Sequence, residues 1–281
     1  MTATALSSPG SKAGRLQRAA LDVLRRYEAD GATPTTVRFV YYDLKQAGYP
    51  LIRHARRTDD QDVIDAVKVL RDVGLVPWEW LSDESRSVEG AHLAPSVRQW
   101  LLDVLPQARV NCWDGQPRPM VICESRGVRA ALRATVDRYG AWATSTNGQV
   151  SGFLHTDVAP LLVPGCPVAY FGDWNPAGSI IEANTRSVLE RAVGPLGWER
   201  LAVTPEQAQK AGLPPKPGTD RRYGDGHPHV SYEAEALGHG ELNRLLSDWL
   251  GEQLPVPIEQ IAQREQAERE QLRELLDGDG R

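Results

Sequence analysis

Residues 120–124 have the sequence Met-Val-Ile-Cys-Glu, and residues 168–173 have the sequence Val-Ala-Tyr-Phe-Gly-Asp. Each is a short apolar run that leads to an acidic residue. Each is followed by a segment in which apolar residues have helical spacing, over 126–139 and over 179–193. Short apolar runs that alternate with helices of this length predict a parallel sheet with crossover helices. The predicted fold class is therefore α/β.

Further segments extend this α/β pattern. Residues 141–145 and 200–203 have strand-like sequences, which would bring the sheet to four strands. The stretch from 205 to 229 is rich in Pro, Gly, Lys and Arg, and we expect a long loop there. Helical patterns return over 232–250 and 259–276. The last segment is highly charged, so it either packs across the domain or pairs with a second copy of the chain in a homodimer.

The first part of the chain has a different pattern. Helical spacing over 14–28, 37–47 and 60–73 precedes an apolar and aromatic stretch, Leu75–Leu81, which we expect to be a strand. Three short helices followed by a strand fit a winged helix-turn-helix, although a small helical bundle with no binding role has the same pattern. One more helix is expected over 95–105.

These patterns predict four regions. Residues 1–13 are rich in Ser, Thr, Ala and Gly and are expected to form a disordered tail. The winged-helix region would cover 14–116, and the α/β domain would cover 117–250. The charged C-terminal helix would occupy 251–281. The change of character falls at the polar turn Asp114–Pro119.

Composition limits the class of protein. Of the 281 residues, 41% are hydrophobic and 25% are charged, as in soluble globular proteins. No run approaches the roughly 20 apolar residues of a membrane span, and no secretion signal precedes the first helix. Cys112, Cys123 and Cys166 form no CxxC pair, which favours buried, reduced thiols over disulfides or a zinc site. We therefore expect a cytoplasmic protein with no membrane contact.

The charge is unevenly distributed along the chain. The net charge is −5, yet basic residues greatly outnumber acidic ones between Lys12 and Arg57. Such a region suggests a surface that faces phosphate groups, or simply a solvated helix face. If the partner is DNA, the candidate contacts in this region are Arg38, Arg53, Arg56 and Arg57.

Two carboxylates follow predicted strands. Glu124 comes directly after the first apolar run, and Asp173 comes after the run that ends in Gly172. Functional groups in open parallel sheets gather beyond the carboxyl ends of the strands, so neighbouring strands would bring these acids together. Close carboxylates repel each other, and Mg²⁺ relieves that repulsion because it prefers oxygen ligands. The alternative is that each acid only caps the helix that follows it.

A family resemblance connects these residues. The run Val-Ile-Cys-Glu-Ser at 121–125 resembles the first Toprim motif, in which a strand ends in a glutamate. The segment Gly-Asp-Trp-Asn-Pro-Ala-Gly at 172–178 resembles the second, an Asp-x-Asp-Pro-x-Gly turn that opens a helix. Residues 144–148 lie where such domains carry a glycine-containing loop. Residues 232–237, Tyr-Glu-Ala-Glu-Ala-Leu, are similar to an acidic stretch in relatives of the topoisomerase VI A subunit.

The N-terminal half resembles the same relatives, which include the meiotic double-strand-break transesterases. Residues 36–42 are similar to the Arg-x-x-Tyr-Tyr segment of their winged helix, and residues 83–86 to an Asp-x-x-Arg element of bacterial members. The resemblance spans roughly 15–250, with the motifs in family order. It implies a winged-helix domain, a Toprim domain over 117–250, DNA as the partner, and Mg²⁺ or Mn²⁺ as the cofactor.

The sequence departs from the family pattern at one position and leaves another open. Asn175 stands where the family has the second Asp, so the site would hold its metal more loosely or hold one ion where relatives hold two. Tyr42 matches the tyrosine that attacks the DNA phosphate in the family. Arg38, four residues earlier, would stabilise charge on that phosphate. Otherwise Tyr41 and Tyr42 pack the helix and Arg38 contacts the DNA backbone.

The predicted function is a Mg²⁺- or Mn²⁺-dependent Toprim protein that nicks or cleaves DNA phosphodiesters. Glu124 and Asp173 would be catalytic and hold the metal, with Asn175 as a weaker ligand and water or Tyr42 as the nucleophile. One alternative is a non-catalytic DNA-binding protein with a degenerate Toprim site. Another is a subunit that needs an ATPase partner, since the chain has no P-loop of the GxxxxGK[ST] type.

Overall fold

The computed structural model describes residues 5–51, 60–81, 90–148, 151–214, 216–218 and 229–278. Its centre is a sheet of four parallel strands in the order β2-β1-β3-β4. The strands are β1 (Met120–Cys123), β2 (Trp142–Ser145), β3 (Pro167–Phe171) and β4 (Gly197–Ala202). The predicted α/β class is confirmed, and each strand overlaps an expected run.

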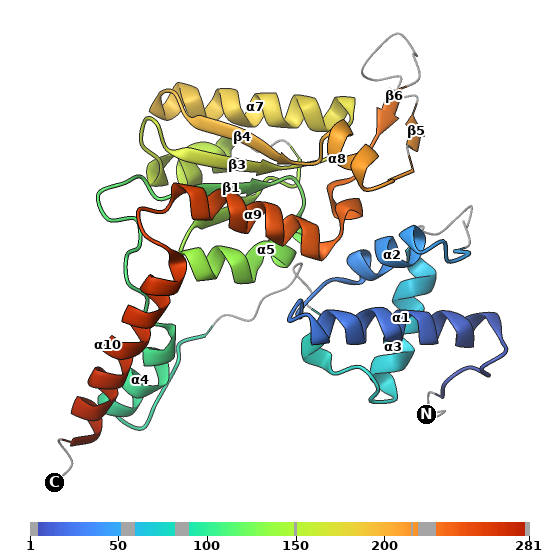
Figure 1. Ribbon diagram of the computed structural model, residues 1–281, viewed down its shortest axis with the longest axis horizontal. Helices are drawn as coiled ribbons and strands as arrows, with labels where there is room; N and C mark the ends of the chain where they lie inside the picture. Colours follow the sequence, from blue (N-terminus) through green and yellow to red (C-terminus); the bar gives the residue numbers. More distant parts are fainter. Residues whose placement is uncertain are drawn as a thin grey trace.

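Helices cover both faces of this sheet. Figure 1 shows α5 (Arg126–Tyr139) and α9 (His239–Gln253) on one face, with α7 (Pro176–Val193) on the other. Alternate residues of a strand point to opposite faces, and two separate cores form as a result. Val121 and Phe171 belong to the core under α5 and α9, whereas Ile122 and Tyr170 belong to the core under α7.

The two crossover helices that follow the acidic residues have clear start signals. Ser125 caps α5 by accepting a hydrogen bond from the backbone N–H of Val128, and Gly140 ends the helix in the left-handed conformation with φ 59°. Asn175 caps α7 in the same way, with Pro176 in the first turn. Because these signals are local, the expected helices form close to their predicted limits.

The N-terminal helices are α1 (Lys12–Ala29), α2 (Val37–Gln46) and α3 (Gln61–Asp72), which pack against one another. The expected strand over Leu75–Leu81 is wrong. Trp78–Trp80 forms a 3-10 helix, η1, after Pro77, and Leu81 makes an isolated parallel bridge to Thr35. Apolar and aromatic content alone suggested a strand, but no neighbouring strand pairs with this segment within the described residues.

Two expectations in the last third of the chain need correction. The expected long loop over 205–229 contains α8 (Pro205–Lys210), which a capping box between Thr204 and Gln207 begins. A short antiparallel pair, β5 (Lys216–Gly218) with β6 (His229–Ser231), follows. The expected helix from Tyr232 is interrupted, because Tyr232 pairs with Trp174 and the backbone turns at Gly238. The 3-10 helix η5 (Ala234–Leu237) lies between these points.

Sequence patterns also missed a helical segment between β2 and β3. It consists of α6 (Ser151–Phe153), the π-helical turn η3 (Leu154–Val158) and the 3-10 helix η4 (Ala159–Leu161). Leu154 and Val158 are buried in the core under α7. The segment therefore packs against α7 and contributes to the core on that face of the sheet.

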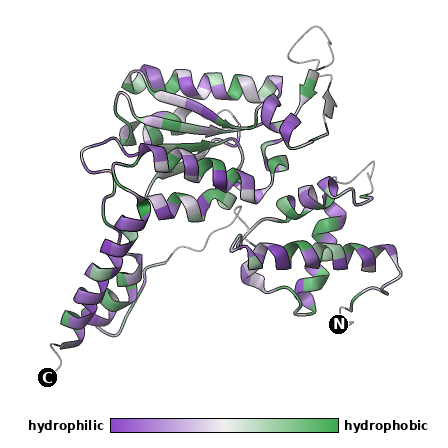
Figure 2. Cartoon of the chain, in the orientation of Figure 1, coloured by the Kyte–Doolittle hydropathy of each residue, from purple (hydrophilic) through white to green (hydrophobic). Residues whose placement is uncertain are grey.

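The charged C-terminal segment is α10 (Ile258–Gly278), and it packs against the region of α4 (Val97–Val104) and the 3-10 helix η2 (Leu105–Gln107). Glu265 accepts a hydrogen bond from the backbone N–H of Val110 at 2.9 Å. Figure 2 shows that α10 is largely hydrophilic, in contrast to the sheet. Among the helices of the described ranges, none is long and apolar enough to cross a membrane.

Candidate acidic site at the carboxyl edge of the sheet

Glu124 and Asp173 lie together just beyond the carboxyl ends of β1 and β3, which are neighbours in the sheet. The backbone N–H of Asp173 donates to Glu124 Oε2 at 3.0 Å. The main chain of Glu124 is held on both sides. Its N–H donates to the carbonyl of Phe171 at 2.8 Å, and its carbonyl accepts from Asn147 at 2.9 Å. Strand register therefore places the two acids side by side.

The electrostatics of this pair are unfavourable without a cation. Burial, followed by the negative charge of Asp173, raises the pKa of Glu124 to about 7. The hydrogen bond from the Asp173 N–H and the charge of Arg200 act in the opposite direction. Keeping both carboxylates charged thus costs free energy, and a bound cation would recover it.

Two glycines leave room around the Glu124 carboxylate. A Cβ atom at Gly172 would lie 2.9 Å from Glu124 Oε2 and 2.6 Å from Tyr170 Cε1. A Cβ atom at Gly178 would lie 3.2 Å from the same carboxylate oxygen. Side chains at these positions would crowd the acidic pair, so the glycines of the Gly-Asp-Trp-Asn-Pro-Ala-Gly segment keep its surroundings open.

Asn175, the expected weaker ligand, has a structural role. Its Oδ1 accepts a hydrogen bond from the backbone N–H of Gly178 at 2.8 Å, which caps α7. Asp173 also has a contact in this region, because its Oδ1 accepts from the N–H of Ala234 at 2.9 Å. The amide oxygen of Asn175 thus stabilises the start of α7.

The acidic stretch at 232–237 folds back onto the site. Glu235 is only 3% exposed, and burial raises its pKa. Its Oε1 accepts from Ser125 Oγ at 3.0 Å, and its Oε2 lies 3.3 Å from Arg38 Nε. Glu233 lies 3.5 Å from Arg38 Nη2. Glu233 precedes the 3-10 helix η5 and Glu235 lies in its first turn, as an acid pair at a helix start would, and their contacts with Arg38 also connect α2 to the edge of the sheet.

Arg38 and Tyr42 occupy successive turns of α2. The Arg38 side chain is half exposed, and its Cζ lies 5.9 Å from the centre of the Tyr42 ring. Tyr42 is 4% exposed and packs edge-on against Tyr41, with 5.1 Å between the ring centres. It also borders a small cavity together with Glu233. Arg38 is thus close to the acidic site, and Tyr42 is largely enclosed.

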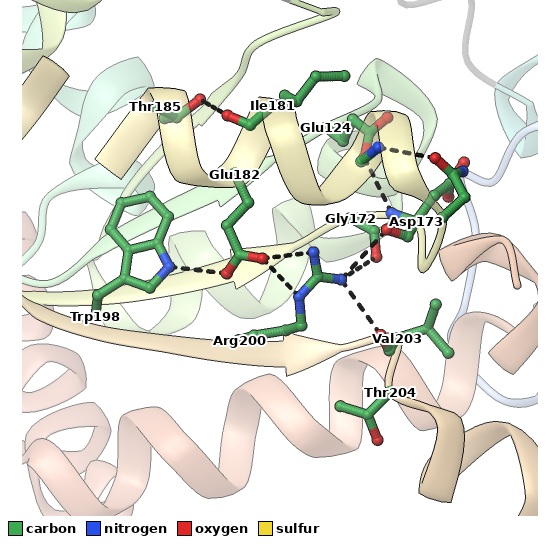
Figure 3. Close-up of polar contacts among 12 residues, drawn as sticks. Glu124, Gly172, Asp173, Ile181, Glu182, Thr185, Trp198, Arg200, Val203 and Thr204 are labelled. Atoms are coloured by element: carbon green, nitrogen blue, oxygen red, sulfur yellow. Dashed lines mark hydrogen bonds and ion pairs between the residues drawn. The ribbon is translucent and has the colours of Figure 1, made fainter. Parts of the chain in front are cut away.

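Sequence reasoning missed a second arginine. Arg200, on β4, lies between Glu182 of α7 and the carbonyl groups at the ends of β3 and β4 (Figure 3). The Glu182 carboxylate lies 2.8 Å from Arg200 Nε, and Trp198 Nε1 donates to the same carboxylate at 3.0 Å. Trp198 and Arg200 are two apart on β4, which places both on one face, but the expected strand at 200–203 began after Trp198. That spacing was the available signal.

Arg53, Arg56 and Arg57 lie outside the described residues, as does the Asp-x-x-Arg element at 83–86. Within the described ranges, no group of three or more His, Cys, Asp or Glu side chains is placed to hold a metal ion. Protein ligands for a cation would therefore be Glu124 and Asp173, with the other positions left for water or substrate oxygens.

Comparison of the chain with protein-family models, with curated proteins and with solved structures finds no match. The Toprim resemblance thus depends on the motifs quoted above.

Proposed function

We propose that this protein is a Toprim-type enzyme that cuts DNA phosphodiesters with the help of Mg²⁺ or Mn²⁺ held by Glu124 and Asp173. The observation that carries the proposal is the contact at 3.0 Å between the Asp173 N–H and Glu124 Oε2. It brings two carboxylates to one edge of a parallel sheet, where such folds bind ligands.

The residues present fit a hard divalent cation. Both side chains offer carboxylate oxygens, and Gly172 and Gly178 keep the space clear. Burial, followed by the charge of Asp173, raises the pKa of Glu124, and a cation would offset both effects. Mg²⁺ often binds through one or two carboxylates and completes its coordination with water and phosphate oxygens. When bound, the ion would supply positive charge that polarises the scissile phosphate.

DNA would reach this edge along α2. Arg38 is half exposed and close to the acidic pair, so it can contact a phosphate oxygen there. The N-terminal helices, interpreted as the winged helix of the family, would position the duplex mainly through phosphate contacts. Because Tyr42 is 4% exposed, we favour water as the nucleophile. The attack of water on phosphorus forms one P–O bond and breaks another, and it leaves one DNA end with a hydroxyl group and the other with a phosphate group.

Supercoiled plasmid tests the proposal. With Mg²⁺ or Mn²⁺, the wild type should nick the plasmid, and Glu124→Gln and Asp173→Asn should lower the rate at least about 100-fold. Glu252→Gln, which alters an exposed acid on α9, is the matched control and should cut normally. Equal cutting by all four proteins, or none by the wild type with either metal, would contradict the proposal. A protein–DNA adduct that disappears in Tyr42→Phe would assign the attack to tyrosine.

A second candidate is a DNA-binding protein that does not cut. The role of Asn175 as the cap of α7 favours this second candidate. The resembled family has an acidic ligand at this position, whereas Asn175 carries no charge and its Oδ1 already accepts a hydrogen bond from Gly178. Asp caps helices as well as Asn does, so Asn175→Asp should keep the fold and restore the acid. Salt-dependent DNA binding by the wild type, with cutting only after Asn175→Asp, would select this candidate.

A further inference from the structure

Arg200 contacts three backbone carbonyls at the strand ends that form the acidic site. Its Nη1 lies 2.9 Å from the carbonyl oxygen of Gly172, 3.4 Å from that of Asp173 and 3.3 Å from that of Val203. The arginine side chain is only 12% exposed. This largely enclosed guanidinium thus connects the ends of β3 and β4.

The Gly172–Asp173 peptide group lies between Arg200 and Glu124. Its carbonyl oxygen accepts from Arg200 Nη1, and also from the backbone N–H of Val203 at 2.9 Å. Its N–H donates to Glu124 Oε2 at 3.0 Å. Because a peptide group is planar and rigid, rotation that breaks the contact with Arg200 also moves the N–H that holds Glu124.

Glu182 holds the arginine in this orientation. Its carboxylate lies 2.6 Å from Nη2 and 2.8 Å from Nε, so the guanidinium is engaged on one side by an acid and on the other by carbonyls. The planar fork of arginine suits this arrangement, and the single ammonium of lysine does not. Since Glu182 balances the charge of Arg200, the pair acts on the acidic site mainly through geometry.

We propose that Arg200 is a positioning residue that fixes the Gly172–Asp173 peptide group, and thereby the spacing of Glu124 and Asp173, so that it sets their affinity for a divalent cation. The part that concerns the cation rests on the proposed function. Residues that orient metal ligands from behind commonly change metal affinity 10- to 100-fold when they are replaced. Arg200 stands in that relation to Glu124.

The test compares Arg200→Met with Arg186→Met in the full-length protein. Arg186 forms an exposed i,i+4 pair with Glu190 on α7, so its removal takes away an Arg–Glu pair that does not reach the site. Mn²⁺ binding, followed by the electron paramagnetic resonance signal of free Mn²⁺, should weaken at least about tenfold in Arg200→Met and stay unchanged in Arg186→Met. Wild-type affinity in a folded Arg200→Met would overturn the proposal.

A second measurement needs no metal. Hydrogen exchange at the Asp173 amide should be about tenfold faster in Arg200→Met than in the wild type or Arg186→Met, because the peptide group loses one of its anchors. Unchanged exchange would refute the positioning role. If Arg200→Met does not fold, Arg200→Lys takes its place, with both effects in the same direction and about threefold in size.

The two measurements separate this inference from the proposed function. If the wild type binds no Mn²⁺, the proposed function fails and the cation part of the inference fails with it. Exchange at Asp173 still decides whether Arg200 holds the peptide group. If the wild type binds Mn²⁺ and Arg200→Met binds it equally well, only the inference fails.

Discussion

Two arginines lie near the acidic pair, and they differ in how they are held. Arg38 comes from α2, has a side chain that is 50% exposed, and contacts Glu235 and Glu233 at 3.3 and 3.5 Å. Arg200 comes from β4, is 12% exposed, and contacts Glu182 at 2.6 and 2.8 Å. Both are Arg–Glu contacts, but the Arg38 side chain is half exposed and its contacts are longer, while the Arg200 side chain is enclosed and its contacts are shorter.

The difference indicates two kinds of role. The half-exposed guanidinium of Arg38 can contact a phosphate group from its solvent side while it keeps its contact with the buried Glu235. An enclosed pair is different, because removal of one partner leaves a charge in a poorly solvated place. We infer that Arg38 serves contact with a partner and that Arg200 serves the geometry of the site.

The largest expected effect is on stability. Glu182→Ala should lower the free energy of unfolding by about 2 kcal/mol, because it leaves Arg200 enclosed without its acid and also removes the acceptor of Trp198. Glu233→Ala should cost less than about 1 kcal/mol, because Arg38 keeps Glu235 and solvent. Urea unfolding of both variants measures the difference. Equal losses would remove the distinction between the two arginines.

The pH dependence of stability should reveal the acidic pair. The folded protein raises the pKa of Glu124 from its ordinary 4.5 to about 7, so it binds that proton more tightly than the unfolded chain does. The resulting stabilisation is complete below about pH 4.5 and is lost as the pH rises through about 7. In metal-free buffer, Glu124→Gln should therefore be more stable than the wild type by roughly 1–2 kcal/mol at pH 8, with little difference at pH 4.5.

Thermal unfolding with and without Mg²⁺ provides the control for that measurement. Mg²⁺ should raise the unfolding temperature of the wild type more than that of Glu124→Gln at pH 8, because a ligand that binds only the folded state raises the unfolding temperature. A wild type that is already more stable than Glu124→Gln at pH 8 without metal would show that the two carboxylates do not oppose each other.

The smallest expected effect is on DNA binding. Arg38→Ala should weaken binding to duplex DNA about fivefold in EDTA and reduce the slope of log affinity against log salt by about one, since one phosphate contact is lost. Arg200→Met should leave both quantities unchanged under the same conditions, because Arg200 is enclosed. Fluorescence anisotropy at several salt concentrations measures them. A larger loss in Arg200→Met would reverse the assignment of roles.

Local sequence signals determined much of this fold. The apolar runs before Glu124 and before Gly172 form neighbouring strands, and Ser125 and Asn175 begin the helices that follow. The Thr204–Gln207 capping box was also present in the sequence, although the surrounding Pro and Gly residues suggested a loop. Strand periodicity and capping involve residues only a few positions apart, so the sequence alone can specify them.

Tertiary structure decided which of these pieces meet. The order β2-β1-β3-β4 makes Glu124 and Asp173 neighbours, and Glu235 meets Ser125 although the two are 110 residues apart. The direction of Arg200 likewise follows from the packing of α7 on β4, because Glu182 receives it there. Such contacts depend on the pairing of distant elements and on burial, and no local pattern encodes them. The sequence therefore determined which residues could form an acidic site, and the pairing of distant elements determined that Glu124 and Asp173 meet at the edge of the sheet beside Arg200.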